Sequence, residues 1–401
     1  MPKKILFFAE YITLSHPGRC FVLADLLKES GYELAIAVSP KVSKLIPPIF
    51  SRIFDLTSIP GEVFLNRVSK GQLPYTDAEL DAYVREEAQI LADYKPDLII
   101  SDFRLSLGVS ARLAHVPYVN IASVYWKPET HKKYIVPDLF PLTSLFPIPL
   151  AQALFDVFAP MAFQKYCRLF NDFRACHGLA PLGNDIAHVY TEGDYIIYDD
   201  VFGFRASPQP DGATREFHLG PLNWALRGDL PDWWGKLPQD RPKILISVGS
   251  SGSPKSFNHL VKALEHRRET LIIITAKNNI RDSLSPNIVF ADYLPMKDAM
   301  QHCDLFVGNG GISSYLALEA GIPAIGIPHI LDQYLCCEHL SSTGACEMIR
   351  GDRVRSRELN GLIDRMLAQP SYRLAAKKMA EKIGHSDLAN NFSGIITRIL
   401  A

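Results

Sequence analysis

Three features are scarce or missing in this sequence, and each absence excludes a class of protein. The seven cysteines are an odd number without a Cys-x-x-Cys pair or a His spacing typical of zinc, which favours a reducing compartment and excludes a zinc module. The chain has no large excess of positive or negative charge, because it contains 42 Lys and Arg and 43 Asp and Glu. We therefore expect no nucleic-acid partner. The longest uncharged stretch, Leu139 to Phe155, contains three prolines and cannot form a regular spanning helix. The apolar run Ile5–Ala9 is too short for a signal peptide, so we expect a cytoplasmic protein.

The chain of 401 residues is long enough for two domains. In its first half, short apolar runs alternate with amphipathic stretches, as in parallel strands joined by crossover helices. Ile5–Ala9, Glu33–Val38 and Leu98–Ser101 are expected strands. Phe21 to Ser30 has helical spacing and is followed by Gly31, a typical residue after a helix end.

The same alternation restarts after a segment rich in Gly, Pro, Trp and Asp. We therefore predict an N-terminal domain over 1–222, a linker over 223–241 and a C-terminal domain over 242–401. The last expected helices lie around Arg357–Leu367 and Arg373–Ile383 and are followed by a tail. The last helices of the chain are candidates for packing back on the first domain. Two tandem α/β domains of this kind predict two facing Rossmann-like lobes, with ligands in the cleft at the carboxyl ends of the strands.

An apolar, proline-rich region interrupts the first domain between Trp126 and Phe163, before a helix expected from about Met161 to His177. Tyr125, Trp126 and this insertion are candidates to line a hydrophobic binding pocket or to contact a membrane surface. Ordinary packing between the domains is the alternative.

A glycine-rich segment lies where an expected strand, Leu305–Gly308, runs into a helix. It reads Gly308-Asn309-Gly310-Gly311-Ile312-Ser313-Ser314. Such a junction offers backbone N–H groups, hydroxyls and the positive end of a helix to an anion, most plausibly a phosphate. A glycine-rich turn without a ligand is the other interpretation of this loop alone.

The whole segment from Phe290 to Tyr334 resembles the donor-binding signature of the GT-B glycosyltransferases, in the group of UDP-glycosyltransferases and macrolide glycosyltransferases. The resemblance runs through Tyr293-Leu294-Pro295, Cys303-Asp304-Leu305, the Gly308–Ser314 loop, Ala317-Leu318, Ala320-Gly321-Ile322-Pro323 and Asp332-Gln333. It implies a GT-B fold and transfer of a hexose from a nucleoside diphosphate sugar, with uridine as the expected nucleoside.

The resemblance also implies a role for each matching residue. Tyr293 would stack on the base, and the backbone of Leu294 would pair with the base edge. Asp332 and Gln333 would bind sugar hydroxyls. The diphosphate would be held by a larger set: Gly308, Asn309, Gly310, Gly311, Ser313 and Ser314, with Ser250 and Ser251 from a second loop at the start of the domain.

Three positions depart from the family pattern. Aligned without gaps, Gly308 stands where the family usually has a His, whereas a one-residue slip would place Asn309 there. Met296 stands where the family has a Gln. The glutamate that reaches the ribose falls on Leu316, so Glu319 is the candidate substitute. The chain contains no Asp-x-Asp pair, the metal site of the other large glycosyltransferase fold, so no metal or other cofactor is expected.

His16 lies between the first strand and the expected first helix, where the family keeps its catalytic base. An imidazole can take a proton from a hydroxyl near neutral pH, although a loop His beside Pro and Gly is often only a surface or capping residue. Asp102 ends the strand Leu98–Ser101 and should emerge at the same sheet edge. We therefore predict a His16–Asp102 dyad, in which the carboxylate orients the imidazole.

These observations together predict an inverting, metal-independent transfer of a hexose to a hydroxyl of a small, largely apolar acceptor, such as a natural product or a lipid. Two alternatives remain open at this point. One is a nucleotide-sugar epimerase on the same fold, and the other is a non-catalytic binding or activator protein, suggested by Gly308 and Leu316.

Overall fold

A computed structural model of the chain describes residues 2–128, 133–138, 140–202, 205–208, 214–226, 228–247, 260, 262–267, 271–275, 287–351 and 354–401. The chain forms two compact units. Unit 1 comprises Met1–Lys133, Ala153–Trp224 and Ser386–Ala401, and unit 2 comprises Tyr134–Gln152 and Ala225–His385. The assignment of one domain to the acceptor and the other to the donor stays a prediction, as do their limits, because the extents of the two units do not reveal which ligand each unit binds.

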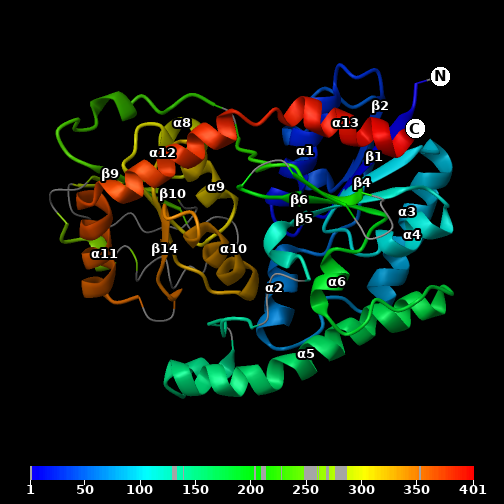
Figure 1. Ribbon diagram of the computed structural model, residues 1–401, viewed down its shortest axis with the longest axis horizontal. Coiled ribbons are helices and arrows are strands. Elements are labelled where there is room, and N and C mark those ends of the chain that lie inside the picture. The colour runs from blue at the N-terminus through cyan, green and yellow to red at the C-terminus, as the bar shows by residue number, and fades with distance from the viewer. Residues whose placement is uncertain are drawn as a thin grey trace. The chain divides into compact units, whose positions relative to one another are not determined.

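Unit 1 is built on an eight-stranded sheet in the order β3-β2-β1-β4-β5-β6-β8-β7 (Figure 1). Its strands are β1 (Lys4–Ala9), β2 (Glu33–Val38), β3 (Arg52–Asp55), β4 (Leu98–Asp102), β5 (Tyr118–Ser123), β6 (Tyr195–Asp199), β7 (Arg205–Pro208) and β8 (Thr214–His218). Neighbouring strands are parallel except β7 and β8, which are antiparallel.

Helices cover both faces of this sheet, which explains why its central strands are continuous apolar runs. Successive side chains of a strand point to opposite faces. In β1, Ile5 and Phe7 pack with α1 (Ser15–Leu27) and α13 (Leu388–Leu400), whereas Leu6 and Phe8 pack with α3 (Asp77–Tyr94) and α4 (Leu107–Leu113). Unit 1 also contains α2 (Gly61–Ser69) and α6 (Ile186–Tyr190). Helix α5 (Ile148–Cys176) starts in unit 2 and continues in unit 1.

Unit 2 is built on a six-stranded parallel sheet in the order β11-β10-β9-β12-β13-β14. Its strands are β9 (Lys243–Ser247), β10 (Leu271–Thr275), β11 (Ile288–Ala291), β12 (Leu305–Gly308), β13 (Ala324–Gly326) and β14 (Cys346–Met348). Its described helices are α8 (Met296–Met300), α9 (Ile312–Glu319), α10 (Leu331–Ser341), α11 (Ser356–Ala368) and α12 (Pro370–Gly384). Ile244, Leu305 and Val307 pack with Leu359 and Ile363 of α11 to form one of its cores.

Three helices differ from the sequence-based expectation. α1 begins at Ser15 rather than at Phe21, because a proline is tolerated in the first turn of a helix. α5 begins at Ile148 and continues through Pro160. The end of the chain, expected to be a tail, is the helix α13, whose Phe392 and Ile396 are fully buried in the core of unit 1.

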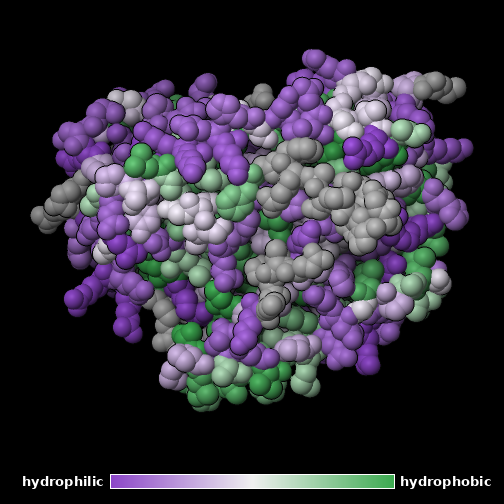
Figure 2. Space-filling model, viewed as in Figure 1, coloured by the Kyte–Doolittle hydropathy of each residue, from purple (hydrophilic) through white to green (hydrophobic). Residues whose placement is uncertain are grey.

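Large apolar side chains are exposed along α5. Val157 is 64%, Phe158 49% and Met161 66% exposed. Figure 2 shows hydrophobic side chains gathered along the lower edge of the view, where α5 runs in Figure 1. Within the described part of the chain, no helix is long and apolar enough to cross a membrane. The expected contact with a membrane surface stays a prediction.

Candidate active site

The structure places His16 and Asp102 at the same edge of the first sheet. Ala9 and Asp102 are register partners at the carboxyl ends of β1 and β4, and His16 lies in the first turn of α1, just beyond β1. The Nδ1 atom of His16 is 2.8 Å from Oδ1 of Asp102. Asp102 is completely buried, whereas the His16 side chain is 12% exposed. With Nδ1 engaged by the carboxylate, Nε2 is the nitrogen that can take a proton.

Phe103 fixes the plane of the His16 ring. It has a left-handed backbone with φ of 57°, which is rare for a bulky residue. Its ring stacks on the imidazole with a centroid separation of 4.9 Å and an interplanar angle of 18°. The imidazole is therefore held by a hydrogen bond at its edge and by an aromatic ring on one face.

Arg19, which carries no recognisable signal in the sequence, binds the same carboxylate. Its Nε lies 2.6 Å from Oδ2 of Asp102, and its Nη2 lies 2.9 Å from Oδ1. Its Nη1 donates to Ser123 Oγ at 3.1 Å and to Asp199 Oδ2 at 3.5 Å. Burial alone would lower the pKa of Arg19, but Asp102 and Asp199 outweigh it and raise that pKa. Arg19 is thus a permanent cation between two buried carboxylates.

Asp199 completes this cluster from the end of β6. Burial raises the pKa of its carboxyl, and the nearby Arg19 opposes that rise. Its Oδ1 accepts a hydrogen bond from the backbone N–H of Leu222 at 3.0 Å. Four neighbouring elements, α1, β4, β5 and β6, therefore contribute polar side chains to one buried cluster around His16.

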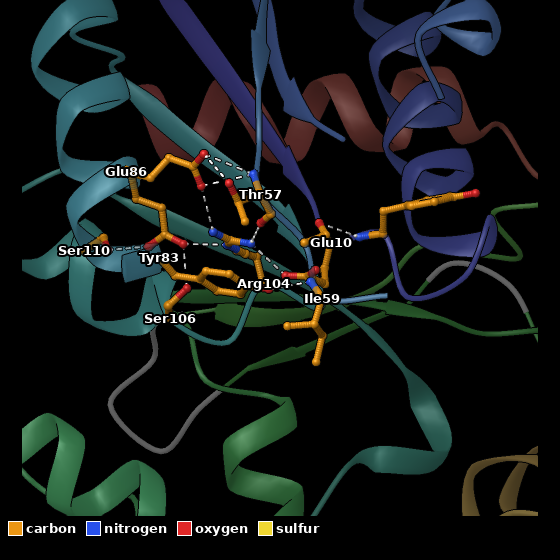
Figure 3. A network of polar contacts seen from close by, with 11 residues as sticks. Glu10, Thr57, Ile59, Tyr83, Glu86, Arg104, Ser106 and Ser110 are labelled. Atoms are coloured by element: carbon orange, nitrogen blue, oxygen red, sulfur yellow. Dashed lines mark hydrogen bonds and ion pairs between the residues drawn. The ribbon is translucent and has the colours of Figure 1, made fainter. Parts of the chain in front are cut away.

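A second buried network holds the loop that follows Asp102 (Figure 3). Arg104 is fully buried and pairs through Nη1 with Glu10 at 2.8 Å and through Nε with Glu87 at 2.5 Å. Its guanidinium also lies over the Tyr83 ring, 3.5 Å from the centroid. Because Glu10 follows β1 and Arg104 follows β4, this ion pair ties the two strand ends that carry the dyad.

Aromatic rings extend from His16 toward the predicted acceptor residues. Phe103 is 5.3 Å from Tyr190 between ring centroids, and Tyr190 is 4.6 Å from Trp126. Trp126 and its neighbour Tyr125 are both buried. The structure therefore connects Trp126 to the dyad through apolar contacts, and its role in acceptor binding stays a prediction.

The glycine-rich loop lies at the carboxyl edge of the second sheet. Gly308 ends β12 beside Ser247 of β9 and Gly326 of β13. A Cβ at Gly308 would stand 2.5 Å from the fully buried ring of Phe306, which explains why no His occupies this position. Gly310 has φ of 76°, and a Cβ there would stand 2.9 Å from the backbone oxygen of Gln333. Packing thus requires glycine at both positions.

The loop leads directly into α9, whose N-cap is Gly311. Ser313 lies in the first turn and is partly exposed, whereas Ser314 and Asn309 are buried. The N-terminus of a helix favours an anion, because its first N–H groups point outward and the helix dipole is positive there. The arrangement suits the predicted diphosphate contact.

Tyr293 and Leu294 lie between β11 and α8. Tyr293 is 46% exposed, and a Cβ added at Gly228 would stand 3.9 Å from its ring. Leu294 is buried. An exposed aromatic face beside a short helix is what stacking on a base requires.

Asp332 and Gln333 lie in the first turn of α10. Gln333 is buried, and its Oε1 accepts a hydrogen bond from the backbone N–H of His329 at 2.9 Å. Glu319 lies in the last turn of α9, whereas the glycine-rich loop lies at the N-terminus of that same helix. The Glu319 carboxylate pairs with Lys297 of α8 at 2.5 Å. Ser250 and Ser251 lie outside the described residues.

Comparisons with known proteins place this chain among glycosyltransferases. A family model described as "Erythromycin biosynthesis protein CIII-like, C-terminal domain" matches residues 260–389. A "PGL/p-HBAD biosynthesis glycosyltransferase" of Mycobacterium tuberculosis is 35% identical over 383 residues, which cover 95% of this chain and 89% of the relative. A "PGL/p-HBAD biosynthesis rhamnosyltransferase" of Mycobacterium bovis is also 35% identical, covering 95% and 84%. An "Inactive PGL/p-HBAD biosynthesis glycosyltransferase" of Mycobacterium bovis is 37% identical over 65% of this chain and 71% of the relative.

Solved structures show the same fold. The spinosyn forosaminyltransferase SpnP superposes with a TM-score of 0.69 at 16% identity, over 99% of each chain. The glycosyltransferase VinC in complex with dTDP gives a TM-score of 0.66 at 19% identity, again over 99% of each chain. The relatives and the fold together show that the chain belongs to the GT-B glycosyltransferases of the EryCIII-like, macrolide glycosyltransferase group, with the PGL/p-HBAD biosynthesis glycosyltransferases as its relatives.

Proposed function

We propose that this glycosyltransferase moves a deoxyhexose from a thymidine diphosphate sugar to a hydroxyl of a largely apolar natural product or lipid, with inversion at the anomeric carbon. The observation that carries the chemistry is the hydrogen bond between His16 Nδ1 and the buried Asp102 carboxylate. It leaves Nε2 of His16 to accept the proton of the acceptor hydroxyl.

The reaction we propose is a single displacement. The acceptor oxygen loses its proton to His16 and forms a bond to the anomeric carbon, while the bond from that carbon to the diphosphate oxygen breaks. The electron pair of the broken bond leaves with the diphosphate, through a transition state with oxocarbenium character. The N-terminal end of α9 and the hydroxyls of Ser313 and Ser314 would stabilise the negative charge on the leaving group.

The nucleoside proposed here differs from the uridine that the sequence suggested. The relative named as a rhamnosyltransferase supports a deoxyhexose as the transferred sugar. The structural neighbour solved with dTDP supports thymidine diphosphate as its carrier. The base would stack on Tyr293, and Asp332 and Gln333 would bind the sugar hydroxyls.

A non-catalytic role is the second candidate, because one relative is named as inactive. The departure at Gly308, where Phe306 leaves no room for a side chain, also removes a potential cationic contact to the diphosphate. The two candidates differ in one measurable property: only the enzyme releases nucleoside diphosphate in the presence of an acceptor.

The test combines binding with turnover. Purified protein is melted with dTDP, UDP, GDP and their hexose and deoxyhexose conjugates, since a ligand that binds only the folded state raises the melting temperature. The donors that bind are then incubated with phenolic and lipid alcohols, and glycosylated products are measured by mass spectrometry. We expect a larger shift with dTDP than with UDP, followed by product. A larger shift with UDP refutes the thymidine proposal, and nucleotide binding without any product across the acceptors supports the non-catalytic role.

A further inference from the structure

A carboxylate of the proline-rich insertion, on a side chain that is 7% exposed, binds to the part of unit 2 that carries the predicted sugar site. Segment Tyr134–Gln152 belongs to unit 2, although the chain on either side of it belongs to unit 1. Asp138 of this segment accepts from His329 Nδ1 at 2.8 Å, from the Tyr334 hydroxyl at 2.6 Å and from Arg350 Nη2 at 3.0 Å. The backbone N–H of Asp138 donates to the carbonyl oxygen of His329 at 3.1 Å. Three side-chain donors from unit 2 therefore fix the position of the Asp138 carboxylate.

His329 links Asp138 to Gln333, because it forms hydrogen bonds with both residues. Both the side chain and the carbonyl of His329 are bound to Asp138, and its ring packs on the backbone of Gly351, where any Cβ would overlap it. Its backbone N–H then donates to Oε1 of Gln333. Because a backbone N–H can only donate, the carbonyl oxygen of the Gln333 amide must face His329. The amide nitrogen then faces away from the His329 N–H, and it is the donor that the proposed function directs at a sugar oxygen.

We propose that Asp138 is a positioning residue for the donor sugar, which fixes the orientation of the Gln333 amide through His329. This inference rests on the proposed function, in which Gln333 binds a sugar hydroxyl. Asp138 itself does not touch the donor. It holds the peptide of His329 in place so that Gln333 meets the sugar as a hydrogen-bond donor.

The insertion is well suited to this role because several contacts hold it in place. Gln152 ties its two ends together, since Oε1 accepts from the Val136 N–H at 2.8 Å and Nε2 donates to the Tyr134 carbonyl at 2.9 Å. Arg350 also donates to the Val136 carbonyl at 2.8 Å and lies 5.1 Å from the centroid of the buried Tyr334 ring. Because these hydrogen bonds already hold the segment, the Asp138 carboxylate can fix the neighbouring His329 peptide with little further loss of conformational entropy.

The experiment measures donor and acceptor kinetics for Asp138→Asn, Asp138→Ala, Gln333→Ala and the double variant Asp138→Ala/Gln333→Ala. Tyr372→Phe is the matched control, because it removes a hydrogen bond of 2.6 Å to another carboxylate of unit 2, Glu347, outside this chain of contacts. We expect Asp138→Ala to raise the donor KM about tenfold, the size of one charge-assisted hydrogen bond, with the acceptor KM unchanged. Asp138→Asn, which keeps the shape and an oxygen acceptor, should show a smaller rise. Tyr372→Phe should resemble the wild type.

The double variant separates positioning from general damage. If Asp138 acts through Gln333, the double variant is no worse than Gln333→Ala alone. Multiplied effects, an equal rise in the acceptor KM, or a wild-type donor KM in Asp138→Ala would each overturn the inference. If Asp138→Ala does not fold, Asp138→Asn paired with Gln333→Ala gives the same comparison. Absence of transfer by the wild-type enzyme would instead refute the proposed function.

Discussion

Replacing Arg19 by Met removes the cation that bridges Asp102 and Asp199. Both carboxylates are buried, and Arg19 contacts the first at 2.6 and 2.9 Å and the second at 3.5 Å. Breaking a buried ion pair from one side costs about 3–5 kcal/mol, because the remaining charge is left without compensation. For a domain of this size, that free energy corresponds to a fall in melting temperature of roughly 6–20 °C.

The loss of stability should depend on pH in a defined direction. Burial already raises the pKa of Asp199 and Arg19 opposes the rise, so the variant should bind a proton on Asp199 more tightly in the folded state. A carboxyl whose folded pKa lies above its unfolded value stabilises the protein below the unfolded pKa, and that contribution is lost as pH rises through the folded pKa. The deficit of Arg19→Met relative to the wild type is therefore largest at neutral pH and smaller at pH 5.

The assay is thermal unfolding at pH 5 and pH 7.5, with glycosyl transfer measured at the same time. Arg52→Met is the control, because Arg52 and its partner Asp93 are 47% and 53% exposed, and such a pair contributes at most about 1 kcal/mol. Transfer by Arg19→Met should fall at least tenfold, since Asp102 loses its second anchor. An Arg19→Met variant as stable as Arg52→Met, or one destabilised equally at both pH values, would show that Arg19 does not compensate the two buried carboxylates.

Three further predictions concern other parts of the molecule. Gly310→Ala should lose about 1–3 kcal/mol of stability and most of its nucleotide-induced thermal shift, because of the left-handed backbone; wild-type shifts would contradict this. Arg104→Met should lose about 3–5 kcal/mol at pH 7.5 and less at pH 5, since burial raises the pKa of Glu87 and protonation relieves the uncompensated charge; melting curves at the two pH values check the sign. Val157→Glu with Phe158→Glu should reduce co-flotation with phosphatidylcholine vesicles, and equal flotation of variant and wild type would argue against a membrane contact through α5.

The fold could be predicted because its central strands carry their own signal. Runs such as Ile5–Ala9 and Leu98–Ser101 are apolar at every position or nearly so, which indicates strands covered on both faces, and the comparisons confirm the GT-B resemblance. The start of α1 was predicted too late because Pro17 and Gly18 read as a loop. Gly18 is required by packing instead, since a Cβ there would stand 2.8 Å from the Trp224 ring, more than 200 residues away.

The contacts around the candidate site could be predicted only in part. His16 and Asp102 lie at strand ends that the topology brings together, so their proximity follows from the order of the strands. Arg19 carries no local signal of burial, because its partners come from β4, β5 and β6. The pairing of Asp138 with His329 joins residues 191 positions apart and depends on the path of an irregular insertion. Patterns of period 2 or 3.6 contain no information about such pairs.

His16, the proposed base, belongs to unit 1, whereas the predicted donor-binding residues belong to unit 2. The most direct test measures His16→Ala in two ways, by the thermal shift with the preferred nucleoside diphosphate and by product formation with its sugar conjugate and an acceptor. We expect a thermal shift like that of the wild type together with a loss of transfer of about 10²–10⁴-fold. Wild-type turnover in His16→Ala would contradict it.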